Sequence, residues 1–138
     1  MDPRASVLIV DDETFIRQIL ARIVSREGYE VRQACDGQDA LDCLSEASWD
    51  IVISDIKMPN MNGIELLGEI KTIHPDVGVI LITAYAGEYS AEEALKAGAD
   101  AFIAKPFKNI EIAETLRKVL QKNLRSRSKT TALISQLK

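Results

Sequence analysis

Five short apolar runs, most of them rich in β-branched residues, recur along the chain between more polar segments. Runs of four to six residues are too short to cross a membrane, and they predict buried β-strands. We therefore expect strands over residues 6–10, 30–34, 50–54, 78–83 and 101–104.

Between these runs, apolar residues recur with the three- and four-residue spacing of amphipathic helices. The first such segment ends at Gly28, a residue type that favours the position just after a helix. Ser90 is the expected N-cap of a shorter helix. Predicted helices cover 13–28, 36–47, 62–74, 90–99 and a segment from about 109 onward. Their core-facing stripes are expected to include Phe15, Ile16, Ile19, Leu20, Ile23, Val24, Ala40, Leu44, Ala47, Ile64, Leu67, Ile70, Ile73, Ile110, Ile112, Ala113, Leu116, Val119, Leu120 and Leu124.

Strands that alternate with helices predict parallel pairing through right-handed crossovers. Continuously apolar strands such as VLIV and VILI indicate a sheet that is covered on both faces. The fold class is therefore α/β, a three-layer sandwich. In such sheets ligands bind beyond the carboxyl ends of the strands.

The composition agrees with one globular domain of 138 residues, 46% of them apolar and 28% charged. The chain has neither a membrane-length apolar stretch nor a cleavable signal segment, so we expect a cytoplasmic protein without membrane contact. Cys35 and Cys43 are expected to be reduced and packed in or near the core.

Charge is distributed unevenly along the chain. Residues 1–104 contain 8 basic and 19 acidic residues, whereas residues 105–138 contain 9 basic and 2 acidic ones. The basic residues are spread over a predicted amphipathic helix without interleaved aromatic residues. We therefore do not expect this domain to bind nucleic acid directly.

Polar residues close four of the five predicted strands. Asp11 and Asp12 follow the first strand, Asp55 the third, Thr83 the fourth and Lys105 the fifth. Because the ends of parallel strands share one edge of the sheet, three acids, a hydroxyl and a lysine should meet in one crevice. Such a cluster of acids is costly unless a cation or a metal ion offsets it.

The segments LIVDDE, IVISDIKMPNMNG, LITAY and GADAFIAKPF resemble the receiver domain of bacterial two-component response regulators. The resemblance covers residues 5–124. It implies a flavodoxin-like sheet of order 2-1-3-4-5 with five flanking helices, and it leaves 125–138 as a helical extension or linker.

The resemblance also implies a role for each matched residue. Asp55 corresponds to the aspartate that accepts a phosphoryl group from a sensor histidine kinase or a phosphotransfer protein. Asp11, Asp12 and Asp55, with the backbone carbonyl of Lys57, correspond to the ligands of Mg²⁺. Thr83 and Lys105 correspond to the groups that contact the phosphoryl oxygens.

Further roles are implied for residues near the site. Phe102, with Thr83, corresponds to the switch pair of the family, and Tyr85 to a position bordering the phosphoryl site. The domain would then catalyse its own phosphorylation and dephosphorylation, and would control an output domain or a downstream protein.

Each residue also has a purely structural interpretation. Asp12 could cap the first helix, Asp55 could be an acid of a turn-rich loop, and Thr83 could be an ordinary strand residue. Lys105 could be a surface lysine, although the family resemblance suggests a cis peptide bond before Pro106.

Other classes of protein fit less well. A flavodoxin-like nucleotide binder would not present the acids of VDDE to a phosphate. A metal-dependent phosphatase with an aspartyl nucleophile needs a second acid two positions later, where this chain has Lys57. A degenerate receiver that only binds other proteins remains the alternative.

The last residues, RSRSKTTALISQLK, leave two interpretations open. Leu133, Ile134 and Leu137 could continue an apolar seam toward a homodimer or an output domain. Equally, the polar RSRSKTT could be a frayed linker. The chain could be a stand-alone regulator or part of a longer one.

Overall fold

The computed structural model describes residues 4–84, 87 and 91–136, with side chains as far as residue 125. The strands are β1 (Ser6–Val10), β2 (Glu30–Ala34), β3 (Ile51–Asp55), β4 (Gly78–Thr83) and β5 (Ala101–Ala104). The helices are α1 (Thr14–Arg26), α2 (Gly37–Glu46), α3 (Gly63–Ile73), α4 (Ala91–Lys96) and α5 (Asn109–Gln136). The predictions for Ser90 and Tyr85 concern positions outside the described residues.

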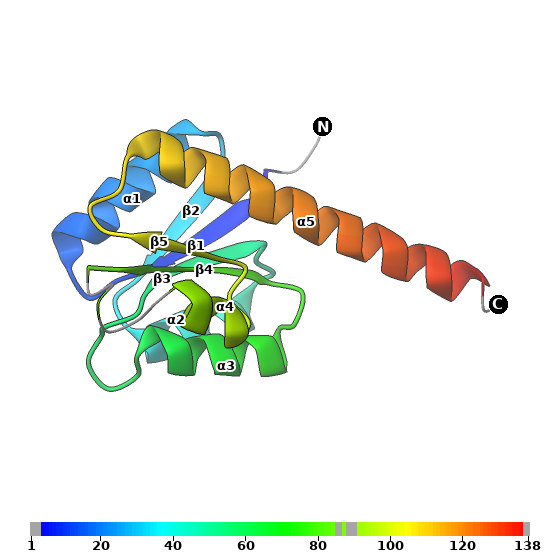
Figure 1. Cartoon of the computed structure of the whole chain (residues 1–138), viewed down its shortest axis with the longest axis horizontal. Helices are drawn as coiled ribbons and strands as arrows, with labels where there is room; N and C mark the ends of the chain where they lie inside the picture. The colour runs from blue at the N-terminus through cyan, green and yellow to red at the C-terminus, as the bar shows by residue number, and fades with distance from the viewer. Residues whose placement is uncertain (1–3, 85–86, 88–90, 137–138) are drawn as a thin grey trace.

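The five strands form one parallel sheet in the order β2-β1-β3-β4-β5. Helices α1 and α5 lie on one face of this sheet, and α2, α3 and α4 lie on the other (Figure 1). The predicted three-layer α/β sandwich and its strand order are confirmed. The carboxyl ends of β1, β3, β4 and β5 are consequently neighbours.

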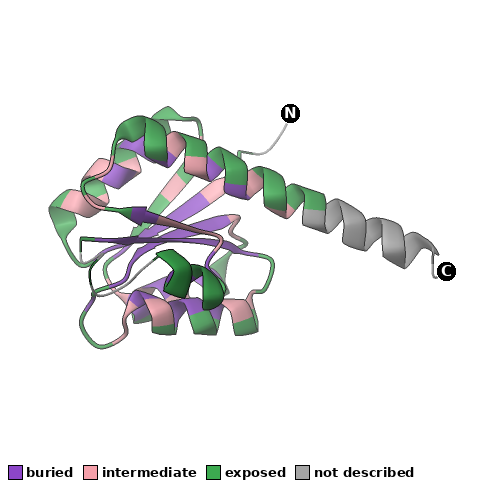
Figure 2. Ribbon diagram, in the orientation of Figure 1, coloured by how far each residue is buried: buried purple, intermediate pink, exposed green. Residues whose placement is uncertain are grey.

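The core follows from the alternation of side chains along each strand. Val7 and Ile9 point toward α1 and α5, whereas Leu8 and Val10 point toward the opposite helices. All four side chains are completely buried, as is most of the central sheet (Figure 2). A sheet buried on both faces explains why its strands read as continuous apolar runs.

Five residues predicted to face the core are exposed instead, one of them Ala47, the residue that follows α2. The exposed fractions of the others are 72% for Phe15, 57% for Ile73, 64% for Ile110 and 51% for Leu124. The first three lie in the first or last turn of their helices, where little of the sheet remains to cover a side chain. Helical spacing identifies the apolar stripe of a helix, but it does not show where the sheet that covers this stripe ends.

The cysteine prediction is correct for Cys43, which is buried, and wrong for Cys35, which is exposed. Cys35 follows β2, an edge strand, and is therefore covered on fewer sides. Both thiols are free.

Helix α5 extends well past the sheet as one continuous helix (Figure 1). The segment over 125–136 is therefore helical, which favours the helical extension over a frayed linker. In the part of the chain that the structure describes, no helix combines the length and apolar character needed to span a bilayer.

Candidate functional site

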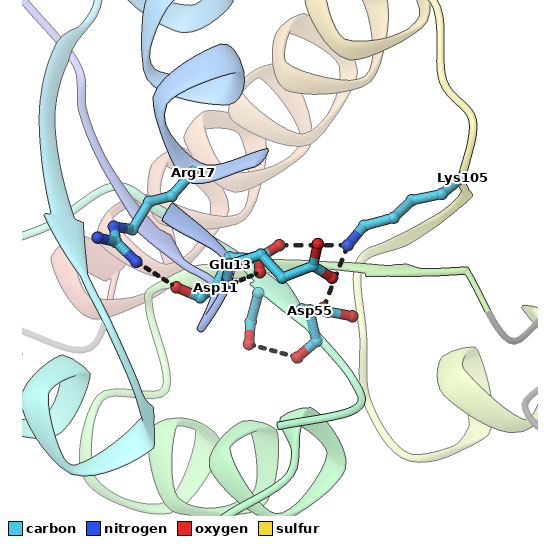
Figure 3. Close-up of polar contacts among 6 residues, drawn as sticks. Asp11, Glu13, Arg17, Asp55 and Lys105 are labelled. Atoms are coloured by element: carbon cyan, nitrogen blue, oxygen red, sulfur yellow. Dashed lines mark hydrogen bonds and ion pairs between the residues drawn. The ribbon is translucent and has the colours of Figure 1, made fainter. Parts of the chain in front are cut away.

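Asp11, Asp55 and Lys105 meet at the carboxyl edge of the sheet (Figure 3). The Lys105 ammonium Nζ lies 3.2 Å from Oδ2 of Asp11 and 3.1 Å from Oδ2 of Asp55. Asp55 is 6% exposed and Asp11 is 1% exposed, so both carboxylates are almost withdrawn from water. The peptide bond between Lys105 and Pro106 is cis, as the resemblance suggested.

Asp12 completes a group of three carboxylates. One ligand oxygen from each of Asp11, Asp12 and Asp55 lies within 4.8 Å of the others. Asp12 is exposed, and its side chain forms no hydrogen bond or ion pair with another described residue. The three carboxylates offer hard oxygen donors, which suit a divalent cation such as Mg²⁺.

The alternative role of Asp12 as a helix cap is not observed. Helix α1 begins after Glu13, and no side chain caps its first turn. Helix α3, by contrast, has a complete capping box formed by Asn62 and Glu65. The carboxylate of Asp12 is thus not engaged in capping.

The remaining predicted residues surround this group. Thr83 is completely buried at the end of β4, next to the strand that ends in Asp55. Lys57 lies two residues after Asp55, and its backbone N–H donates a hydrogen bond to the Asp55 carboxyl group. Phe102 is half-buried on β5, and it packs toward the α2–α4 side of the sheet.

A recess of about 410 Å³ opens over Asp55. Its floor carries Asp55 and Lys105, and its wall includes the loop after β3. It is lined by Asp12, Glu13, Asp55, Lys57, Met58, Pro59, Ala84 and Lys105.

The charges of the site shift its pKa values. Burial raises the pKa of the Asp55 carboxyl, and although Lys105 lowers it, the nearby charge of Asp11 raises it further. The pKa of Lys105 is raised as well, because the carboxylates of Asp55 and Asp11 outweigh the effect of burial. Lys105 is therefore positively charged at neutral pH, while ionised Asp55 costs free energy without a further cation.

Three residues to which the sequence interpretation gave no role also contribute to the site. Glu13 lines the recess. Arg17 on α1 donates to the main-chain carbonyl of Asp11, just after β1, and to the side-chain oxygen of Gln33 on β2. An arginine near a helix start carries no distinctive local signal, so sequence reasoning had little with which to find it.

A parallel sheet of this order, with an acidic cluster and a lysine at its carboxyl edge, defines the class of receiver-like α/β domains. The model of the response regulator receiver domain matches residues 7–117. The chain therefore belongs to the response regulator receiver domain family, which operates in two-component signal transduction.

Individual relatives agree with this assignment. The chemotaxis protein CheY of Thermotoga maritima is 44% identical over 114 residues, which cover 82% of this chain and 95% of that protein. Sporulation initiation phosphotransferase F of Bacillus subtilis is 40% identical, covering 83% of this chain and 92% of that protein.

A solved structure also matches the extended α5. NtrX from Brucella abortus superposes with a TM-score of 0.85 at 33% identity, and the match covers 99% of this chain and 30% of that one. Chains of this kind thus occur both as nearly entire proteins and as parts of longer ones.

Proposed function

We propose that this domain accepts a phosphoryl group on the carboxylate of Asp55 from the phosphohistidine of a sensor histidine kinase or a phosphotransfer protein. One observation supports this most strongly: a buried carboxylate lies 3.1 Å from a lysine ammonium at the floor of an open recess. In the transfer, an oxygen of Asp55 forms a bond to phosphorus while the bond from phosphorus to the histidine nitrogen breaks. The imidazole leaves with that electron pair.

The side chains around Asp55 suit this step. Phosphoryl transfer depends mainly on positioning and on stabilising charge at the phosphoryl oxygens. Lys105 supplies a fixed positive charge at the floor of the recess. Thr83, buried at the end of the adjacent strand, would contribute its hydroxyl group to a phosphoryl oxygen once Asp55 is phosphorylated.

Asp11, Asp12 and Asp55, with the backbone carbonyl of Lys57, would hold Mg²⁺. The oxygen donors and the excess of negative charge in this cluster fit that ion. When bound, Mg²⁺ supplies the positive charge that lets an anionic carboxylate approach an anionic phosphoryl group. The fold itself holds the three carboxylates close together before the partner arrives.

Phosphorylation would then change the surface formed by α4, β5 and α5. An added phosphoryl group carries nearly two negative charges and several acceptor oxygens. If Thr83 moves toward it, Phe102 on the neighbouring strand gains room to turn inward. This shift in population would control an output domain or a downstream protein. A homodimer formed through the extension of α5 remains a prediction.

Labelling with acetyl phosphate tests the proposal. Intact-mass spectrometry should detect one added phosphoryl group on the wild type with Mg²⁺ and none with a chelator. Asp55→Asn should abolish the added mass, and Asp100→Asn is the matched control at the other end of the sheet. Thr83→Ala should keep the label and weaken the downstream response.

The alternative of a degenerate receiver, which binds its partner without phosphorylation, makes the opposite prediction. Wild-type protein would then remain unlabelled under all of these conditions. The carboxylate group and the paired Lys105 favour the competent receiver, because a binding surface alone has no need to bury clustered charges.

A further inference from the structure

Asp11 is held by its neighbours at every polar group. Its backbone N–H donates to the carbonyl of Ala34 at 3.3 Å, and its carbonyl oxygen accepts from Nη1 of Arg17 at 2.7 Å. Its carboxylate accepts from the backbone N–H of Glu13 through Oδ1 and from Lys105 through Oδ2. The residue that begins the loop after β1 therefore has one orientation.

Arg17 makes two contacts that join separate elements. While Nη1 reaches the carbonyl of Asp11, Nε donates to Oε1 of Gln33 on β2 at 3.2 Å. Figure 3 shows the guanidinium turned away from the acids and toward the main chain of Asp11. A planar guanidinium fixes the direction of its donors, so these two contacts together hold the carbonyl in place.

Helix stability does not explain this arginine. Arg17 is the fourth residue of α1, close to the positive end of the helix dipole, where a cation is mildly unfavourable. Helix α1 contains no acidic residue with which Arg17 could form an ion pair. Its hydrogen bonds lead to the site loop and to β2 instead.

The orientation of the Asp11 carbonyl determines where Asp12 lies. A peptide unit is planar, so the carbonyl of Asp11 and the N–H and Cα of Asp12 move together. Asp12 has no recorded side-chain partner of its own in the described part of the chain. The peptide plane that Arg17 holds therefore sets the position of the Asp12 Cα, from which the carboxylate extends.

We propose that Arg17, steadied by Gln33, is a positioning residue for the cation-binding loop: it orients the Asp11–Asp12 peptide so that the Asp12 carboxylate faces Asp11 and Asp55. This inference rests on the proposed Mg²⁺ site. It adds a residue outside the ligand set whose effect on the ion passes entirely through the backbone. Residues that support ligands in this way commonly change metal affinity by about 10- to 100-fold.

Calorimetric titration with Mg²⁺ tests the proposal on the full chain. Arg17→Ala should weaken Mg²⁺ binding about 10-fold. Arg17→Lys keeps the charge but loses the paired donors, so it should recover only part of the affinity. Gln33→Leu should give a smaller loss. Arg22→Ala, an exposed position on the same helix, is the control and should bind as the wild type does.

A second measurement needs no metal. Amide hydrogen exchange in chelator should accelerate at Asp12 and Glu13 in Arg17→Ala, because the Glu13 N–H donates to a carboxylate whose backbone is no longer fixed. Urea unfolding of the same variants shows whether any change in affinity merely follows a loss of stability.

The possible outcomes separate the two proposals. Unchanged affinity and unchanged exchange in Arg17→Ala would overturn the positioning role. Full recovery by Arg17→Lys, or an equal loss in Arg22→Ala, would also overturn it, because charge alone would then suffice. If the wild type takes up no Mg²⁺, the proposed function fails. Faster exchange in Arg17→Ala would still support the ordering of the loop, and unchanged exchange would refute it.

Discussion

The two ends of the sheet both bury aspartate against lysine, but they balance charge differently. At the amino end, Asp100 is 10% exposed and accepts hydrogen bonds from Lys71 at 2.9 Å and from the Val79 backbone at 2.8 Å. Lys122 adds a second ammonium at 3.4 Å. At the carboxyl end, Asp11 and Asp55 share the ammonium of Lys105, and the third carboxylate of the cluster, Asp12, forms no ion pair with it.

This difference distinguishes a structural ion pair from a site. Asp100 is satisfied by the protein alone, and its network ties α3, β4 and α5 together. The carboxyl end is left with excess negative charge, which only an added cation or partner can offset. The size of a recess does not identify the site, because a larger recess of about 710 Å³, near Trp49 and His74, lies away from the three carboxylates.

The largest expected effect compares one acid from each end. Asp12→Asn should weaken Mg²⁺ binding at least about 100-fold, or about 2.7 kcal/mol, because it removes a direct ligand charge. Asp100→Asn removes the same charge where two amines already balance it, and should leave the affinity unchanged. Calorimetry on both variants gives the comparison. Equal losses would mean that net charge, rather than a defined site, governs binding.

Two glycines allow the two ends of the sheet to be compared by the steric effect of an added methyl group. A methyl group on Gly63 would meet the carbonyl oxygen of Asp55 and, at 2.8 Å, Cα of Ile56, both of them backbone atoms. On Gly78 it would meet only side-chain atoms, the amide of Asn123 at 2.6 Å and Cγ1 of Val119 at 2.7 Å, which can adjust more readily than backbone atoms. Gly63→Ala should therefore cost about 2.5 kcal/mol in urea unfolding and slow labelling of Asp55.

Gly78→Ala, by contrast, should cost about 1 kcal/mol and leave labelling as it is in the wild type. If the two variants lost equal stability, or if Gly63→Ala were labelled normally, the close approach of α3 to Asp55 would have no part in shaping the site.

Much of this molecule was predictable from its sequence, for physical reasons. Strands such as VLIV and VILI are apolar throughout because both faces of the sheet are covered, so they are visible in the pattern alone. Asp11, Asp55, Thr83 and Lys105 each close or follow a strand. Parallel strands necessarily bring such positions to one edge.

The features that the sequence did not predict depend on where elements end in space and on contacts between separate segments. Helical spacing placed Phe15 and Ile110 on core-facing stripes, but nothing in the spacing shows where the sheet stops covering them. An acid before a helix resembles a cap, yet Asp12 leaves α1 uncapped. The contacts of Arg17 with Asp11 and Gln33 join residues on three different segments, and no local pattern records them.

A smaller effect is expected for stability at the amino end. Asp100→Asn keeps the size of the side chain but leaves the Lys71 ammonium without its closest anion. Because Lys71 is only partly buried, we expect a loss of about 2 kcal/mol, the value of a hydrogen bond to a charged group. Urea unfolding measures it, with Glu69→Gln on the exposed face of α3 as the control. No loss would show that this network is dispensable.

The smallest expected effect is a gain in stability rather than a loss, and it concerns Asp55 at the carboxyl end of the sheet. Burial and the charge of Asp11 raise the pKa of Asp55, which means that the fold prefers its protonated form. This contribution to stability is complete below the unfolded pKa of about 4 and is lost as the pH rises through the folded value. At pH 7 the ionised Asp55 is therefore a net cost.

Asp55→Asn should consequently stabilise the metal-free protein by about 1 kcal/mol at pH 7, a typical gain for one favourable substitution. The gain should shrink as the pH falls and should be lost below about 4, where the wild-type carboxyl becomes protonated in both states. Added Mg²⁺ should also narrow it, because a bound cation stabilises the wild type more than the variant. Urea unfolding in chelator and in Mg²⁺ at several pH values measures the gain in stability, its dependence on pH and its dependence on Mg²⁺. A variant less stable than the wild type in chelator at pH 7 would show that the bond from Lys105 outweighs the burial of charge, and that both ends of the sheet are balanced alike.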